Sequence, residues 1–84
     1  VADLARADAV AELVQATLDR FGRIDVLVNN AGVGSTLSEW ELTPAEWDRV
    51  HAVNLRAPFF LAQHAARAMR ESGGGSIVNV SSIA

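Results

Sequence analysis

The stretch DVLVNNAGVG, residues 25–34, begins as an apolar strand and ends in two asparagines and two glycines. Its β-branched first half is typical of a strand covered on both faces within a parallel sheet, so we predict a strand over residues 24–30. Asparagine favours turns and glycine weakens strands, which makes residues 32–42 a loop. Two interpretations stay open here: the chain simply leaves the core, or the strand ends where a ligand binds.

An amphipathic helix is predicted before this strand, over residues 8–21. Its apolar side chains recur at helical spacing, and they are Val10, Leu13, Val14, Leu18 and Phe21. Asp8 stands near the N-terminal end of the pattern, and Gly22 follows its last residue, where glycine commonly ends a helix.

The start of a second helix is marked by three residues in the sequence TPAEWDRV. Thr43 is a favourable N-cap, Pro44 fits the first helical position, and Glu46 stands three residues after the cap. These residue types at this spacing predict a capping box, in which two side chains satisfy the free N–H groups of the first turn.

The second helix is predicted to continue to about Glu71, with Pro58 as its only interruption. Proline has no N–H, so the carbonyl of Asn54, four residues earlier, would lose its helical partner and the helix would kink. The sequence SGGG, residues 72–75, ends the helix before a second buried strand, SIVNV, over residues 76–80.

Helix, strand, helix and strand in this order predict an α/β fold in which both strands run parallel and finish at the same sheet edge. The residues that close the two strands would line one crevice, and they are Asn29, Asn30, Ala31, Gly32, Ser81 and Ser82. Ligands bind at this carboxyl edge in open α/β sheets, which favours the ligand interpretation of the opening stretch.

The composition excludes several classes of function. The 84 residues carry a net charge of −3 and no lysine, so no basic surface is expected for nucleic acid or for a membrane. Cysteine is absent, which excludes disulfides and thiol chemistry and is compatible with a reducing cytoplasm. His51 and His64 form no ligand pattern, so no metal site is expected. Because the chain opens on Val1 without methionine, we expect an internal piece of a longer protein.

Four segments resemble, in the same order, the classical short-chain dehydrogenase/reductase family. NNAG, residues 29–32, follows a DVLV strand; EWDRVHAVNLRAPF, residues 46–59, resembles the family's asparagine helix. GGGSIVNVSSIA, residues 73–84, resembles its serine strand, and VADLARADAV, residues 1–10, resembles the segment in which an aspartate and an aliphatic residue contact adenine. The likeness covers essentially the whole chain.

The resemblance implies a Rossmann-type doubly wound parallel sheet, of which residues 1–84 would be the central portion, and NAD or NADP as the coenzyme. The family's catalytic set is Asn, Ser, Tyr and Lys; Asn54 and Ser82 match the first two, whereas the chain has no tyrosine and no lysine. The family's glycine-rich pyrophosphate loop has no counterpart here. The implied coenzyme-binding residues are Asp3, Leu4, Asn29, Asn30, Ala31 and Gly32.

The matched residues also have structural interpretations. Asn54 shares a helical face with Leu61, and a buried polar group left unpaired costs about 1–3 kcal/mol, so we expect Asn54 to have partners. Asp3 could serve the helix that follows it through capping and the helix dipole. Ser82 can donate a hydrogen bond to a carbonyl oxygen that gains charge as hydride arrives, while strand alternation turns Ser81 to the opposite face.

We therefore expect an oxidoreductase that transfers hydride between NAD(P)(H) and a small-molecule alcohol or carbonyl substrate, with 3-oxoacyl carriers as the first substrate class to consider. The alternative is a non-catalytic dinucleotide-binding sensor or scaffold of the same fold. The 84 residues alone would be inactive. The expected parent protein is a cytoplasmic homo-oligomer, dimer or tetramer, without nucleic-acid or membrane partners.

Overall fold

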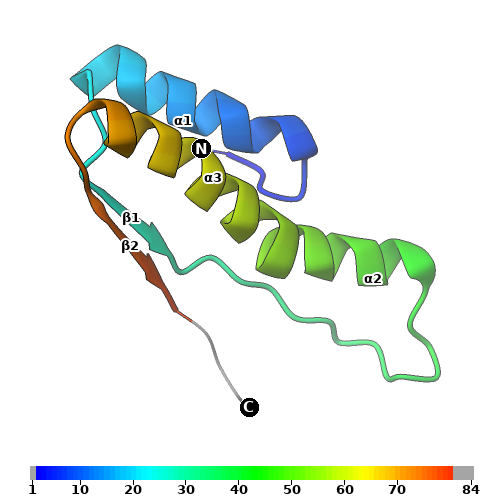
Figure 1. Cartoon of the computed structure of the whole chain (residues 1–84). Coiled ribbons are helices and arrows are strands. Elements are labelled where there is room, and N and C mark those ends of the chain that lie inside the picture. Colours follow the sequence, from blue (N-terminus) through cyan, green and yellow to red (C-terminus); the bar gives the residue numbers. More distant parts are fainter. Residues whose placement is uncertain (1, 81–84) are drawn as a thin grey trace.

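A computed structural model describes residues 2–80 of the chain, and Figure 1 shows how the elements are arranged. Two long helices lie side by side, and one of them packs on a two-stranded sheet. The elements follow in the order α1 (Ala7–Phe21), β1 (Val26–Asn29), α2 (Pro44–His51), the π-turn η1 (Ala52–Arg56), α3 (Ala57–Glu71) and β2 (Ser76–Asn79). The predicted alternation of helix and strand is confirmed.

The two strands pair in parallel and in register, with Asn29 opposite Asn79. The pairing begins where the Ser76 N–H donates to the Asp25 carbonyl and ends where the Val80 N–H donates to the Asn29 carbonyl, both at 2.9 Å. Each strand is shorter than predicted, but the prediction that the strands are parallel neighbours is confirmed.

The first helix matches its prediction to within one residue. It ends at Gly22, which has φ 79° and donates its N–H to the Leu18 carbonyl at 2.8 Å. Glycine adopts this left-handed conformation at little cost, which explains why the helix stops there. Arg6 precedes the helix without a side-chain cap, and Asp8 lies in the first turn, where it pairs with the Arg6 guanidinium at 2.8 Å.

The start of α2 contains only half of the predicted capping box. The Thr43 hydroxyl accepts the Glu46 N–H at 3.2 Å, and Pro44 occupies the first turn as expected. The Glu46 carboxylate instead accepts hydrogen bonds from Arg49, one turn further along the helix. A charged partner at i+3 competes successfully with the neutral N–H of the cap residue.

A π-turn lies immediately before Pro58, at the place where a kink was predicted. At the end of η1 the Ala57 N–H donates to the Ala52 carbonyl, five residues earlier, which is the wider π spacing. Because Pro58 has no N–H to offer the Asn54 carbonyl, ordinary α spacing cannot continue through this point. The chain widens by one residue immediately before the proline and resumes as α3.

Three consecutive glycines carry the chain from α3 into β2. Gly73 and Gly74 have φ values of 99° and 126°, which other residues adopt only with strain. Gly75 is needed for a different reason: a Cβ there would lie 2.6 Å from Met69 Sδ and 2.8 Å from the Asp25 carbonyl oxygen. The crossing between helix and strand is therefore too close for any side chain.

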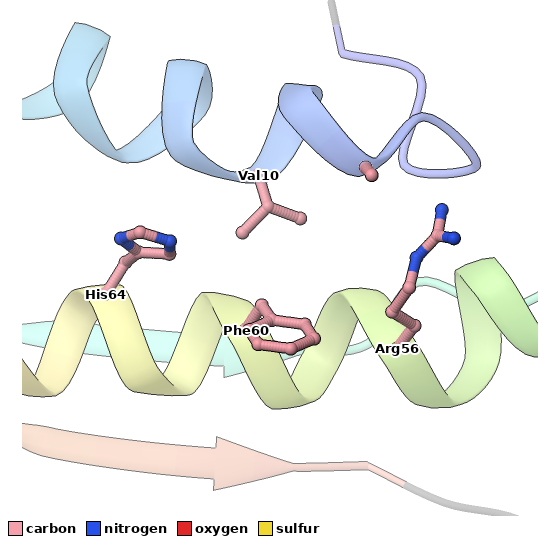
Figure 2. Close-up of a pocket in the computed structure, with 5 residues that line it drawn as sticks. Val10, Arg56, Phe60 and His64 are labelled. Carbon is pink, nitrogen blue, oxygen red and sulfur yellow. The ribbon is translucent and has the colours of Figure 1, made fainter.

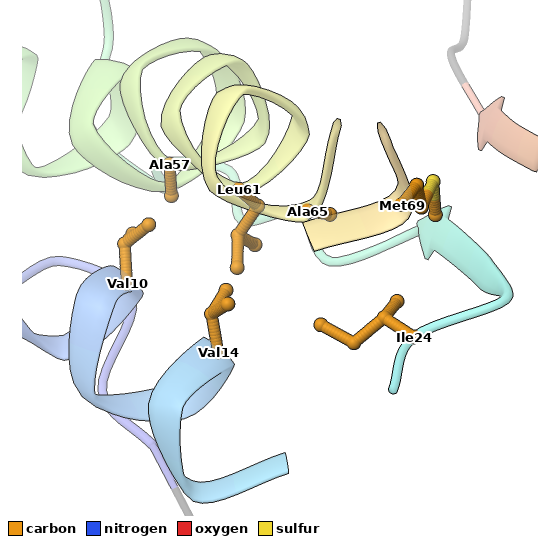
Figure 3. Close-up of a cluster of buried hydrophobic side chains, with 7 residues drawn as sticks. All are labelled: Val10, Val14, Ile24, Ala57, Leu61, Ala65 and Met69. Carbon is orange, nitrogen blue, oxygen red and sulfur yellow. The ribbon is translucent and has the colours of Figure 1, made fainter. Parts of the chain in front are cut away.

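The hydrophobic core lies between the two long helices and continues to the strand that follows α1 (Figure 3). Ala57, Leu61, Ala65 and Met69, spaced four residues apart, form the buried stripe of α3. The buried residues facing this stripe are Val10, Val14 and Ile24. Around the cluster pack the partly buried side chains Leu4, Leu18, Leu27 and Ala68.

The prediction that both strands are covered on two faces is wrong for residues 2–80. The side chains on the face away from the helices are exposed, at 60% for Val26, 55% for Val28, 47% for Val78 and 55% for Val80. The physical reason is that α1 and α3 form a single helix layer, and within the described residues no element covers the opposite face.

We expect residues 1–84, expressed alone, to show no cooperative unfolding transition. The chain exposes 6161 Å², whereas a compact protein of 8.9 kDa exposes about 4,800 Å². An isolated parallel pair of strands with open edges adds little stability. Thermal melting followed by circular dichroism checks this, and a sharp transition together with dispersed amide signals would contradict it.

Gly75→Ala is expected to lower the free energy of unfolding of the complete gene product by about 1–3 kcal/mol. The added methyl meets the Asp25 carbonyl, which cannot withdraw without losing its bond to Ser76. Gly34→Ala is the matched control, because a Cβ there meets no atom within 4 Å. Urea unfolding measures both variants, and equal stability of the two would show that the crossing is not tight.

Candidate functional site

The carboxyl ends of β1 and β2 are joined through their side chains. Asn29 Nδ2 donates to Asn79 Oδ1 at 2.9 Å and to the Pro58 carbonyl at 3.2 Å. Asn29 is the one buried polar residue of the described core, with 7% of its surface exposed. Its amide thus links both strand ends to the start of α3. The contact of Asn29 with a coenzyme stays a prediction. In the structure its Nδ2 donates both of its hydrogen bonds to other groups of the protein.

Sequence reasoning missed Asn79, although a signal for it was present. In the parallel register Asn79 lies opposite Asn29, so the two side chains share one face of the sheet. Two asparagines at the same place in two predicted neighbouring strands could have been read as a pair.

The residues that follow Asn29 run along the surface. Asn30, Ala31 and Gly32 are exposed, and within residues 2–80 the Asn30 side chain has no hydrogen bond. A Cβ at Gly32 would meet only Asn54 Oδ1, at an ordinary 3.6 Å. The chain's own packing therefore does not require glycine at this position, and an uncovered backbone without a Cβ suits close approach by a ligand.

Asn54 has the partners that were expected, but it is exposed rather than buried. Its Nδ2 donates to the Val33 carbonyl at 2.7 Å, and its Oδ1 accepts the Val33 N–H at 2.8 Å. Asn54 lies in η1, directly after the buried residue Val53, and its amide faces the loop instead of the core. Its amide pairs with the loop backbone as a neighbouring strand would.

Arg49 fastens the next part of the same loop, and sequence reasoning missed it. Its Nη2 donates to the Gly34 carbonyl at 3.0 Å and to Glu46 Oε1 at 2.6 Å. The available signal was the acidic and basic pair three residues apart on one helix face. Together Arg49 and Asn54 hold the loop backbone at two successive residues.

The Arg49 guanidinium lowers the pKa of the Glu46 carboxyl; partial burial opposes this effect and a hydrogen bond from Ser35 adds to it. A lowered pKa means that the stabilising contact is complete at neutral pH and is lost only as the pH falls through that lowered value. The ion pair between Arg49 and Glu46 is therefore formed at neutral pH.

Asp3 and Leu4 occupy the turn that precedes α1. Asp3 Oδ1 accepts the Ala5 N–H at 3.0 Å, and the Asp3 carbonyl accepts the Arg6 N–H at 3.1 Å. Leu4 is half-buried and packs on the core. Among the described residues no hydrogen bond joins Asp3 or Leu4 to the strand edge, so the structure gathers Asn29, Gly32 and Asn54 but not these two.

The predicted catalytic residue Ser82 and its neighbour Ser81 lie outside the described residues, beyond Val80. A groove between α1 and α3 is shown in Figure 2, and none of the predicted site residues lines it. Its lining residues are Ala7, Val10, Arg56, Phe60 and His64. Residues 2–80 contain no cluster of three or more His, Cys, Asp or Glu side chains suited to a metal ion. The strand edge remains the candidate site, because backbone amides and small residues are exposed there.

Comparison with known proteins finds related sequences along the chain. The family profile described as short chain dehydrogenase matches residues 1–84. D-threitol dehydrogenase from Mycolicibacterium smegmatis is 45% identical over 82 residues, which are 98% of this chain and 30% of that protein. An uncharacterized oxidoreductase from Thermotoga maritima is 44% identical over 71 residues, 84% of this chain and 28% of that protein. The chain thus spans about 30% of the curated relatives it matches.

Solved structures show the same arrangement of elements. A metagenomic short-chain oxidoreductase in complex with NADP superimposes with a TM-score of 0.90 at 46% identity, over 100% of this chain and 38% of that one. A short-chain dehydrogenase/reductase variant from Serratia marcescens has a TM-score of 0.84 at 40% identity, over 98% of this chain and 33% of that one. The fold is that of a part of these Rossmann-type sheets.

Asn54→Asp is expected to destabilise the complete gene product by about 1 kcal/mol. The variant keeps an acceptor for the Val33 N–H but presents a second oxygen, instead of a donor, to the Val33 carbonyl. Asn30→Asp makes the same chemical change on an exposed side chain and is expected to alter stability by less than about 0.5 kcal/mol. Urea unfolding and amide exchange at Val33 compare the two; equal behaviour would contradict the role assigned to Asn54.

Proposed function

Because this chain belongs to the short-chain dehydrogenase family, we propose that residues 1–84 form the central part of an NAD(P)-binding Rossmann domain in an oxidoreductase. The proposed reaction moves a hydride between NAD or NADP and an alcohol or carbonyl substrate. The observation that carries the proposal is the strand edge, where Asn29 joins the strand ends and Asn54 holds the exposed segment that follows.

The proposed coenzyme site suits a dinucleotide in two respects. Asn30, Ala31 and Gly32 present uncovered backbone at the carboxyl edge of parallel strands, where such ligands bind. Asp3 and Leu4 would meet the adenine, as the family resemblance implies. The nicotinamide ring, when bound, gives or takes the hydride. The residues of this chain would hold the backbone of the binding segments in place. Asn54 and Arg49 hold residues 33 and 34 in this way.

Ser82 is the proposed hydrogen-bond donor to the substrate oxygen. Its hydroxyl would stabilise the negative charge that develops on that oxygen in the transition state. The tyrosine and lysine that complete the family's catalytic set do not occur in the 84 residues, so they would come from the rest of the parent protein.

The proposed substrates are a general class of compounds and, within it, three specific classes to assay. An alcohol or carbonyl compound suits the family, and 3-oxoacyl carriers are the first class to assay. Sugar alcohols are the second class, because one relative is a D-threitol dehydrogenase. Aromatic carbonyl compounds are the third, because a hydroxynaphthalene reductase-like protein from Metarhizium brunneum is 42% identical over 83 residues.

For the parent protein we propose a cytoplasmic homo-oligomer, dimer or tetramer, that works on small molecules without nucleic acid or membrane partners. The net charge of −3 supports the absence of a polyanion partner. No helix within residues 2–80 is long and apolar enough to cross a membrane.

Ser82→Ala in the complete gene product is expected to lower kcat by about 10²–10³ while leaving the Kd of the coenzyme within about twofold, since one oxyanion donor is lost. Ser81→Ala is the matched control and should retain most of the activity. Steady-state kinetics and coenzyme titration measure both. A large loss from Ser81→Ala with little loss from Ser82→Ala would show that Ser81, and not Ser82, is the donor. Coenzyme binding without turnover of any alcohol or carbonyl compound would instead favour a dinucleotide sensor.

A further inference from the structure

Arg56 makes a long-range contact that the proposed chemistry does not use. It is the last residue of η1, and its Nη2 donates to the Ala5 carbonyl at 2.7 Å, across a separation of 51 residues. Figure 2 shows the Arg56 side chain extending from the helix toward the chain that leads into α1. A charged donor on a backbone carbonyl makes one of the stronger kinds of hydrogen bond, even though the residue is exposed.

The contact continues beyond Ala5 to a predicted coenzyme-binding residue. The Ala5 N–H donates to Asp3 Oδ1 at 3.0 Å, so one peptide residue is held at its carbonyl by Arg56 and at its amide by Asp3. The turn closes with the Arg6 N–H on the Asp3 carbonyl at 3.1 Å. Arg56 is thus connected to the orientation of the Asp3 carboxylate through a single residue.

The same short segment also positions the other half of the site. Asn54, two residues before Arg56, pairs with the Val33 backbone next to the exposed residues 30–32. The two side chains therefore reach from one π-turn to two chain segments far apart in sequence. Side chains two positions apart on a helix do not face each other, so Asn54 and Arg56 reach in different directions from the same turn.

We propose that Arg56 is a positioning residue for the adenine half of the coenzyme site, acting through Ala5 on Asp3. This inference rests on the proposed function, in which Asp3 and Leu4 contact the adenine. Arg56 orders the turn before coenzyme arrives, so less conformational freedom is lost on binding. Through η1 the turn is kept in a constant relation to the segment held by Asn54.

Arg56→Leu in the complete gene product is expected to weaken binding of ADP-ribose, which lacks the nicotinamide, by about tenfold. The KM of the coenzyme should rise by the same factor, while kcat at saturating coenzyme stays within twofold. Arg56→Lys retains a cation able to donate to the Ala5 carbonyl and should recover most of the affinity. Arg67→Leu, an exposed arginine of α3 with no hydrogen bond among the described residues, is the matched control and should bind as the unaltered protein does.

A double-mutant cycle with Asp3→Ala separates this pathway from a general loss of stability. Because Arg56 acts through Asp3, adding Arg56→Leu to Asp3→Ala should weaken ADP-ribose binding by less than twofold further. In the coenzyme-free protein, Arg56→Leu should speed amide exchange at Ala5 and Arg6 and leave the amides of α3 unchanged, which a general loss of stability would not do.

The outcomes distinguish failure of this inference from failure of the proposed function. If the unaltered protein binds neither coenzyme nor ADP-ribose, the proposed function fails. If the unaltered protein binds both, the inference is overturned by any of three results: Arg56→Leu binds ADP-ribose equally well, its effect adds fully to that of Asp3→Ala, or Arg67→Leu shows the same loss.

Discussion

The Asn29 side chain joins three parts of the structure through one amide group. Its Nδ2 donates to Asn79 at the end of β2 and to the Pro58 carbonyl at the start of α3. Because Asn29 is buried, each of these partners replaces water that the amide cannot reach, and losing one leaves a costly unsatisfied group. The relation between the sheet edge and the helix that crosses it is therefore set at a single point, and the exposed segment of the site begins at the next residue.

The second organising feature is the π-turn, and its cause is local. Pro58 cannot donate a backbone hydrogen bond, so the helix widens over Ala52–Arg56 before it continues. The side chains of this region then serve segments that the core does not hold. Asn54 pairs with Val33, Arg56 with Ala5, and from the preceding turn Arg49 reaches Gly34. Side chains of the π-turn and of the preceding turn of α2 thus hold both candidate binding segments.

The two-stranded sheet within residues 2–80 is largely exposed to solvent. Helix α3 contacts β1 on one face, whereas every residue of β2 is exposed and four valines on the opposite face are open to solvent. The chain spans about 30% of its curated relatives and superimposes closely on the matching part of longer Rossmann sheets. Parallel pairing and the shared strand edge are present within residues 2–80, because they depend on the helix that connects the two strands.

Local chemistry by itself determined the boundaries of the helices. Thr43 and Pro44 start α2, Gly22 ends α1, and the glycines after Glu71 end α3, since caps and left-handed residues act within one turn of chain. The parallel pairing and the shared strand edge also followed from the order of the elements, because two parallel strands joined by a helix finish on the same side.

Only the tertiary structure decided which groups far apart in the sequence meet. It exposed Asn54 beside Val33, paired Asn29 with Asn79, and brought Arg56 to Ala5. These outcomes depend on the register of the strands and on the packing of α1 against α3. Residues 51 positions apart become neighbours only when both are fixed, and no pattern within a single element contains that information.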